Sequence, residues 1–91
     1  MLNKSTKNGF YRIINQRTGK IKLLKNYKNG KLHGKIIYYW DNGRIRLSGQ
    51  YNKMSRIGLW RNYNPQGELI LEENYDNIIK LNESKQTRLS I

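Results

Sequence analysis

A repeat of 24 residues constrains the fold of this chain more than any other feature. Glycines, tyrosines and pairs of aliphatic residues all recur at this spacing. The recurring positions are Gly19, Gly43 and Gly67; Tyr27, Tyr51 and Tyr75; Ile21, Ile45 and Leu69; and Leu23, Leu47 and Leu71. A fixed period in this range indicates an architecture built from repeated supersecondary units.

Each repeat is predicted to be one β-hairpin. The clearest copy is Asn29 to Tyr51, with the sequence NGKLHGKIIYYWDNGRIRLSGQY. Its first half is rich in Ile, Tyr and Trp, Asn42-Gly43 is a strong turn signal, and its second half alternates polar with apolar residues. These features together are typical of two antiparallel strands joined by a tight loop.

The whole chain is predicted to be an all-β antiparallel meander of three consecutive hairpins, with about six strands in an open sheet. The repeats span about residues 9–28, 29–52 and 53–76, after a flexible N-terminus at 1–8 and before a C-terminal tail at 77–91. For the tail, a final strand, a short helix and a loose end all remain open. An open sheet has two unpaired edges, which invite pairing with another chain, but the sequence does not fix the oligomeric state.

Strict alternation along each return strand predicts which side chains share a face. On this basis Ile45, Leu47 and Tyr51 lie on an apolar face, as do their counterparts Ile21, Leu23 and Tyr27. The residues predicted to point away are Lys20, Lys22, Arg44, Arg46, Ser48 and Gln50.

Bulky residues occupy one equivalent position of each outgoing strand. If the first loop is one residue longer than the other two, Tyr11, Ile36 and Trp60 coincide, and we expect them to form the core. On strand parity Tyr38 and Trp40 join the Ile36 face, and Tyr39 points outward.

The charge of the chain is large and unevenly distributed. Its formal net charge is +12, and residues 1–67 hold fifteen Lys and Arg against one Asp, whereas residues 68–91 hold three against five acids. A basic field of this kind attracts polyanions and acidic protein surfaces. The chain has no Cys, and its N-terminus lacks the apolar segment of a signal peptide, so we expect a cytoplasmic protein.

The hairpin stretch and the following GLWRNYNPQGELILEENY resemble the variant MORN repeat of bacterial proteins, a group that includes the YwqK-type antitoxin family. The pattern is a Gly, an aromatic or aliphatic residue two positions on, a Tyr pair, a turn Gly and a closing Tyr. It is met by Gly34, Ile36, Tyr38, Tyr39, Gly43 and Tyr51, and by Gly58, Trp60, Tyr63, Gly67 and Tyr75. The resemblance covers about residues 9–76. It departs from the pattern at Ile36 and Asn62, where the pattern prefers aromatic residues, and in the strongly basic first half of the chain. It implies consecutive hairpins in an antiparallel sheet, and it implies no chemistry.

No constellation in the sequence predicts catalysis, a metal site or a cofactor. His33 is the single His, and a triad with Ser48 or Ser55 would have only Asp41 to orient it. The adjacent Glu72 and Glu73 are expected on opposite faces of a strand, where two carboxylates do not cooperate. We therefore expect a protein that is not an enzyme.

The predicted function is a binding module, of antitoxin, immunity or inhibitor type, that docks a basic sheet face on an acidic partner protein. The alternatives are direct binding of nucleic-acid backbone, or a small phage-like inhibitor of a nucleic-acid-handling defence complex. An anionic membrane is a weaker candidate, because no amphipathic helix accompanies the charge. The predicted partner-binding residues are Lys20, Lys22, Lys35, Tyr39, Arg44, Arg46 and Arg61.

Overall fold

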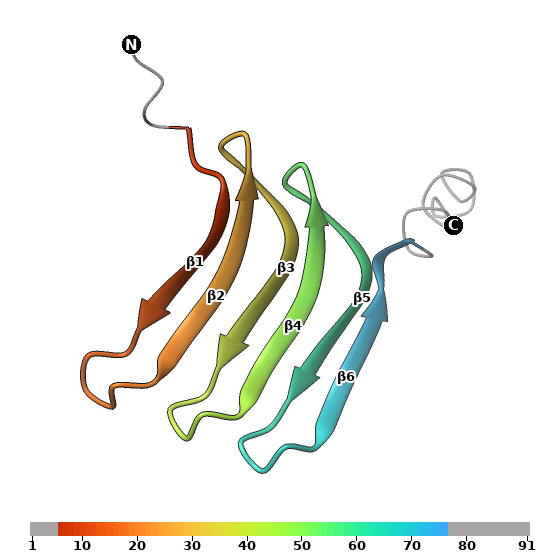
Figure 1. Cartoon of the computed structure of the whole chain (residues 1–91). Coiled ribbons are helices and arrows are strands. Elements are labelled where there is room, and N and C mark those ends of the chain that lie inside the picture. The colour runs from red at the N-terminus through yellow and green to blue at the C-terminus, as the bar shows by residue number, and fades with distance from the viewer. Residues whose placement is uncertain (1–5, 77–91) are drawn as a thin grey trace, which may run out of the picture.

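The computed structural model describes residues 6–76, which form one antiparallel sheet of six strands in sequence order (Figure 1). The strands are β1 (Gly9–Ile14), β2 (Ile21–Lys28), β3 (Lys31–Tyr39), β4 (Ile45–Asn52), β5 (Ser55–Tyr63) and β6 (Leu69–Asn74). The predicted all-β meander of three hairpins is therefore confirmed. The predicted tail at 77–91 lies outside the described residues.

The connections alternate between two kinds, one at each end of the sheet (Figure 1). Longer loops close the three hairpins, over residues 15–20, 40–44 and 64–68, and the first is one residue longer, as predicted. Two-residue turns join the hairpins to one another: Asn29-Gly30 between β2 and β3, and Lys53-Met54 between β4 and β5. All four turn residues have positive φ, which is the backbone conformation of tight hairpin turns.

A β-bulge interrupts the return strand of every hairpin. In the middle hairpin Tyr38 pairs with Leu47 and Tyr39 with Ile45, so Arg46 is the extra residue. Lys22 and Ile70 are the extra residues of the first and third hairpins. The bulge breaks the side-chain alternation, because two residues of one strand oppose a single step of the other.

The bulges correct the predicted face assignment. Ile45 shares the face of its partner Tyr39, while Leu47 shares the face of Tyr38, so the two aliphatic residues point to opposite sides of the sheet. Arg46 was predicted to point away from Leu47. It instead lies over the rings of Tyr38 and Trp40, on the same face as Leu47.

The core is very small. Among the described residues only Ile36 and Trp60 are buried, at 2% and 1% exposed. They occupy equivalent positions of β3 and β5, opposite Gly49 and Glu73, which confirms the equivalence predicted from the repeat. The third member, Tyr11, is opposite Lys25 but 37% exposed, because within residues 6–76 β1 has a neighbouring strand on one side only.

The N-terminal segment contacts the sheet before β1 begins. The backbone oxygen of Lys7 accepts a hydrogen bond from the N–H of Gly30 at 2.9 Å, and Asn8 Oδ1 accepts one from the N–H of Asn29 at 2.9 Å. Met54 donates to the backbone oxygen of Leu32 in the equivalent way at 2.8 Å. Lys7 and Asn8 thus continue the repeat within the segment predicted to be flexible.

Candidate binding surface

Most aromatic side chains gather on one face of the sheet, which we call the aromatic face. Its members are Tyr11, Tyr27, Tyr38, Trp40, Tyr51, Trp60 and Tyr75, together with Ile36. Several of the rings meet edge to face: Tyr11 with Tyr27 at 5.4 Å, Tyr51 with Trp60 at 5.2 Å, and Trp60 with Tyr75 at 6.0 Å between centroids. Such pairs contribute about 0.5–1.5 kcal/mol beyond the area that they bury, so the rings together form an aromatic floor on this face.

Cations lie over this aromatic floor in all three repeats. The ammonium groups of Lys7 and Lys25 lie 5.0 and 5.3 Å from the Tyr27 ring centroid. The Arg46 guanidinium lies over Tyr38 and Trp40, and that of Arg56 lies 4.1 Å from the centroid of Trp60. Ring faces attract cations through their quadrupole, and the long side chains cover the rings with their stems.

The electrostatics of the aromatic face follow from these contacts. Hydrogen bonding from Lys25 lowers the pKa of the Tyr27 phenol; burial opposes the shift, and the positive charges of Lys25 and Lys7 add to it. Burial alone would lower the pKa of the Arg56 guanidinium, but its hydrogen bonds with Tyr51 and Tyr75 outweigh this and raise the pKa. The face therefore favours negative charge near Tyr27.

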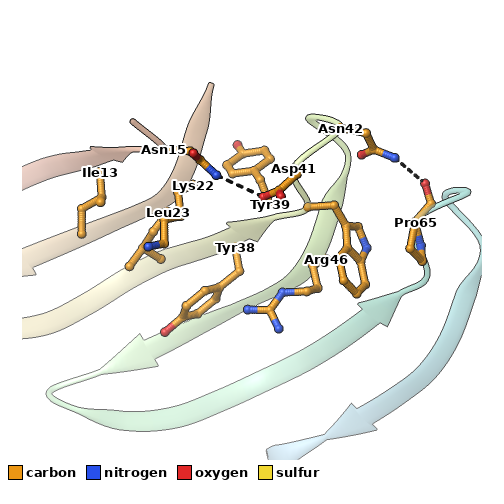
Figure 2. A pocket seen from close by; sticks show the side chains of 11 residues that line it. Ile13, Asn15, Lys22, Leu23, Tyr38, Tyr39, Asp41, Asn42, Arg46 and Pro65 are labelled. Carbon is orange, nitrogen blue, oxygen red and sulfur yellow. Dashed lines mark hydrogen bonds between the residues drawn. The ribbon is translucent and has the colours of Figure 1, made fainter. Parts of the chain in front are cut away.

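A hollow of about 740 Å³ opens on the aromatic face between the first and second hairpins (Figure 2). Ile13, Leu23 and Tyr38 supply apolar surface, and Lys22 and Arg46, the bulge residues of these two hairpins, supply positive charge. The remaining lining residues are Asn15, Tyr39, Trp40, Asp41, Asn42 and Pro65, most of which belong to the hairpin loops. The Trp40 indole N–H is fixed by a 3.0 Å hydrogen bond to the backbone oxygen of Tyr63.

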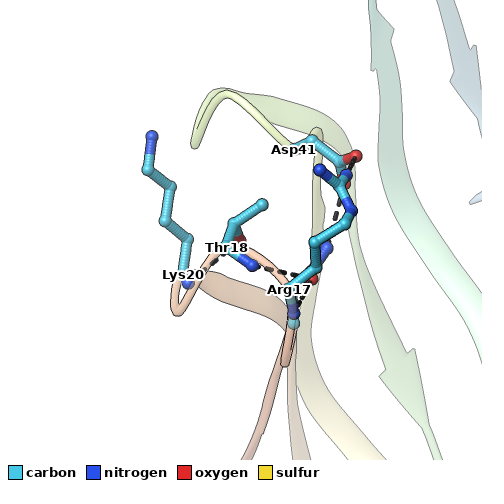
Figure 3. Close-up of polar contacts among 5 residues, drawn as sticks. Arg17, Thr18, Lys20 and Asp41 are labelled. Atoms are coloured by element: carbon cyan, nitrogen blue, oxygen red, sulfur yellow. Dashed lines mark hydrogen bonds and ion pairs between the residues drawn. The ribbon is translucent and has the colours of Figure 1, made fainter.

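The single acid in the lining of the hollow is already neutralised. Asp41 pairs with Arg17 and accepts a 3.1 Å hydrogen bond from Asn15 Nδ2, both from the first loop (Figure 3). The other ion pair of residues 6–76 joins Arg61 to Glu72 at 2.6 Å. Lys22 and Arg46 consequently enter the hollow with no carboxylate partner among the described residues.

The predicted partner-binding residues do not share one surface. Lys22 and Arg46 line the hollow, and Tyr39 also borders it although its pairing with Ile45 places it on the face opposite Tyr38. Lys20 and Arg44 lie beside it in the loops, where Lys20 Nζ is 3.5 Å from the backbone oxygen of Asn42 and Arg44 donates to that of Gln66. Lys35 and Arg61 lie on the opposite face of the sheet, and the hydrogen bond and charge of Glu72 raise the pKa of Arg61.

The sequence interpretation missed several contributors to this surface. Trp40 and Tyr38 were treated as core, and Lys7, Lys25 and Arg56 were not singled out, although each lies over an aromatic ring. The spacing did mark the two bulge cations that were predicted: Lys22 and Arg46 are 24 residues apart, and each follows an aliphatic residue at the same step of the repeat.

The residues weighed for catalysis lie apart from the hollow. His33 Nδ1 is 3.4 Å from the backbone N–H of Lys53, near a turn at the other end of the sheet. Glu72 binds Arg61 while Glu73 lies 3.5 Å from the Tyr75 hydroxyl, so the two carboxylates face opposite sides, as predicted. Within residues 6–76 no three His, Cys, Asp or Glu side chains cluster as metal ligands, and no helix there is long and apolar enough to span a membrane.

No family model, curated protein or solved structure matches this chain.

Proposed function

We propose that this chain is a non-enzymatic binding module that holds an acidic segment of a partner protein in the hollow of its aromatic face. The observation that supports this most strongly is the position of Lys22 and Arg46. Both cations line the hollow, Arg46 lies over the rings of Tyr38 and Trp40, and neither has an ion-pair partner among residues 6–76. A module of this kind acts by occupying a surface of its partner, as antitoxins, immunity proteins and inhibitors do.

The hollow combines two properties that favour protein recognition. Arg46 is held over Tyr38 and Trp40 before any partner arrives, so less side-chain freedom is lost on binding. Arginine and aromatic side chains are also the residues that dominate the energetics of protein interfaces. A six-stranded sheet with loops offers a surface of the size that specific complexes need, about 800 Å² per partner.

Nucleic-acid backbone is the competing ligand, and two observations weigh against it. Proteins that bind single-stranded nucleic acid stack its bases on uncovered aromatic rings. Here Arg46 and Arg56 cover the rings of Trp40 and Trp60. The third hairpin also interrupts any cationic strip across the sheet, because Glu68, Glu72, Glu73 and Asp76 follow one another there with no Lys or Arg between them.

The test compares two double variants with the same change in charge. Lys22→Glu with Arg46→Glu alters the hollow, whereas Lys31→Glu with Lys35→Glu alters two exposed lysines outside it. The tagged full chain and both variants are used to capture partners from the encoding organism, with and without nuclease. A protein that is captured by the unchanged chain and by the control variant, with and without nuclease, but not by the hollow variant, is then purified. Its affinity for the unchanged chain and for each variant is measured by calorimetry.

We expect the hollow variant to lose roughly 10- to 100-fold in affinity, largely through slower association, and the control variant to lose much less. Circular dichroism melting verifies that both variants keep the fold. Submicromolar binding of a random-sequence single-stranded oligonucleotide at 150 mM salt, lost in the hollow variant, would contradict the proposal and support the nucleic-acid alternative.

A further inference from the structure

The two edge strands of the sheet are apolar, exposed and opposite in charge. Ten large apolar or aromatic side chains are exposed in the described part of the chain, and seven of them lie on β1 and β6: Phe10, Tyr11, Ile13, Ile14, Leu69, Ile70 and Leu71. The β1 side of the sheet, residues 6–17, holds Lys7, Arg12 and Arg17 with no acid. Residues 68–76 hold four acids with no Lys or Arg.

The repeat also specifies how these two edges fit each other. Within the chain, the second strand of one hairpin pairs with the first strand of the next, as β2 with β3 and β4 with β5. The registers are equivalent: Leu24 is opposite Ile37, and Ser48 is opposite Arg61. β6 is the second strand of a hairpin with no following hairpin, and β1 is a first strand with no preceding one, within residues 6–76.

We propose that β6 of one molecule pairs antiparallel with β1 of a second copy of this chain, which continues the repeat from one molecule to the next. Advancing the internal register by one repeat sets Leu71 opposite Ile13 of the second copy and Glu72 opposite its Arg12. Glu73 comes opposite Tyr11, and Tyr75 opposite Lys7. Both apolar edges become covered, and the acidic and basic ends of the sheet meet.

Such a contact is head-to-tail and repeats along the sheet, because each copy contributes a different edge to each of its two interfaces. It produces an open filament, or a ring if the curvature of the sheet closes it. The aromatic face then runs without a break from the third hairpin of one copy to the first of the next. This proposal concerns the edges of the sheet and does not depend on what the hollow binds.

The first measurement is the mass of the full chain by analytical ultracentrifugation over a range of concentrations. The monomer is 10.9 kDa, and we expect the average mass to rise with concentration and to fall with added salt. A mass that stays at that of the monomer at every concentration would overturn the proposal.

Charge reversal at the paired position tests the register. Arg12→Glu and Glu72→Lys should each set like charges opposite one another and weaken association by roughly 3- to 30-fold. The double variant, or an equimolar mixture of the two single variants, should recover it. Glu72 also forms an ion pair with Arg61 of its own molecule. Glu72→Lys breaks this pair in the single and in the double variant alike. Recovery therefore reports the contact between copies rather than the fold.

Lys35→Glu serves as the control, because Lys35 lies on β3, which has a neighbouring strand on each side. Lys35→Glu should leave the pair between Arg12 and Glu72 intact. Its effect on the strength of association should be the same in the wild type and in the Arg12→Glu variant. Association that neither single reversal weakens, or that the double variant fails to recover, would overturn the proposed pairing.

Discussion

Trp60 and Gly49 act as a single packing unit in the structure. The indole ring lies directly against the backbone of Gly49, so a Cβ atom added there would lie 2.1 Å from Cδ2 of Trp60. Gly49 lies between Ile36 of β3 and the indole of Trp60, the two buried side chains of the described residues. The lack of a side chain at position 49 is what lets the largest residue of the core lie flat on the sheet.

Gly49→Ala is therefore expected to destabilise the protein by about 1–3 kcal/mol, because the ring must move out of a well-packed position. Urea unfolding followed by circular dichroism measures the change. Ser48→Ala, the neighbouring substitution on the opposite face, should change the free energy of unfolding far less. In a Trp60→Leu background the cost of Gly49→Ala should shrink, and a cost equal to that in the wild type would show that the two sites are independent.

At the scale of the hairpin, the two tight turns have the same geometry with different residues. Asn29 and Gly30 have φ of 51° and 80°, and Lys53 and Met54 have φ of 49° and 74°. Asn-Gly suits two successive positive φ angles, whereas Lys and Met pay a steric penalty from the Cβ atom. The second turn is thus strained where the first is not.

Replacing Lys53-Met54 with Asn-Gly is expected to stabilise the protein by about 1–2 kcal/mol, because Asn and Gly adopt positive φ with less strain than Lys and Met. The reciprocal change, Asn29→Lys with Gly30→Met, should destabilise by a similar amount. Thermal unfolding measures the change in stability of both variants relative to the wild type. A destabilised Asn-Gly variant would mean that the Lys53 or Met54 side chain makes a contact worth more than the strain.

The hairpins were predictable from the sequence, but the faces of their return strands were not. The 24-residue spacing and the turn glycines identify three hairpins and place Ile36 and Trp60 at equivalent positions. Ile45, Arg46 and Leu47 alternate perfectly in sequence, so a bulge at Arg46 leaves no trace in the hydrophobic pattern. Lys22 and Arg46 were therefore assigned to the wrong side, because each is the extra residue of a bulge.

At the scale of the whole molecule, the sheet is a single layer whose strands differ in how many neighbours support them. β3 and β5 each hold one of the two buried side chains, and β2 to β5 all have a strand on both sides. β1 and β6 have one neighbour each within the described residues. Because the hairpins of the described residues contact one another mainly as sequence neighbours, local unfolding is expected to begin at the edges and to reach the centre last.

Native-state hydrogen exchange should therefore give a gradient of protection across the sheet. We expect amides of β3 to β5 to be protected roughly 10- to 100-fold more than those of β1 and β6, which corresponds to about 1.4–2.8 kcal/mol of additional opening free energy. If β6 of one copy pairs with β1 of the next, raising the protein concentration should increase protection at β1 and β6 together and leave the centre unchanged. In Arg12→Glu that increase should require a roughly 3- to 30-fold higher protein concentration, while the gradient persists. Equal protection in all six strands would instead show that the sheet opens only as one cooperative unit.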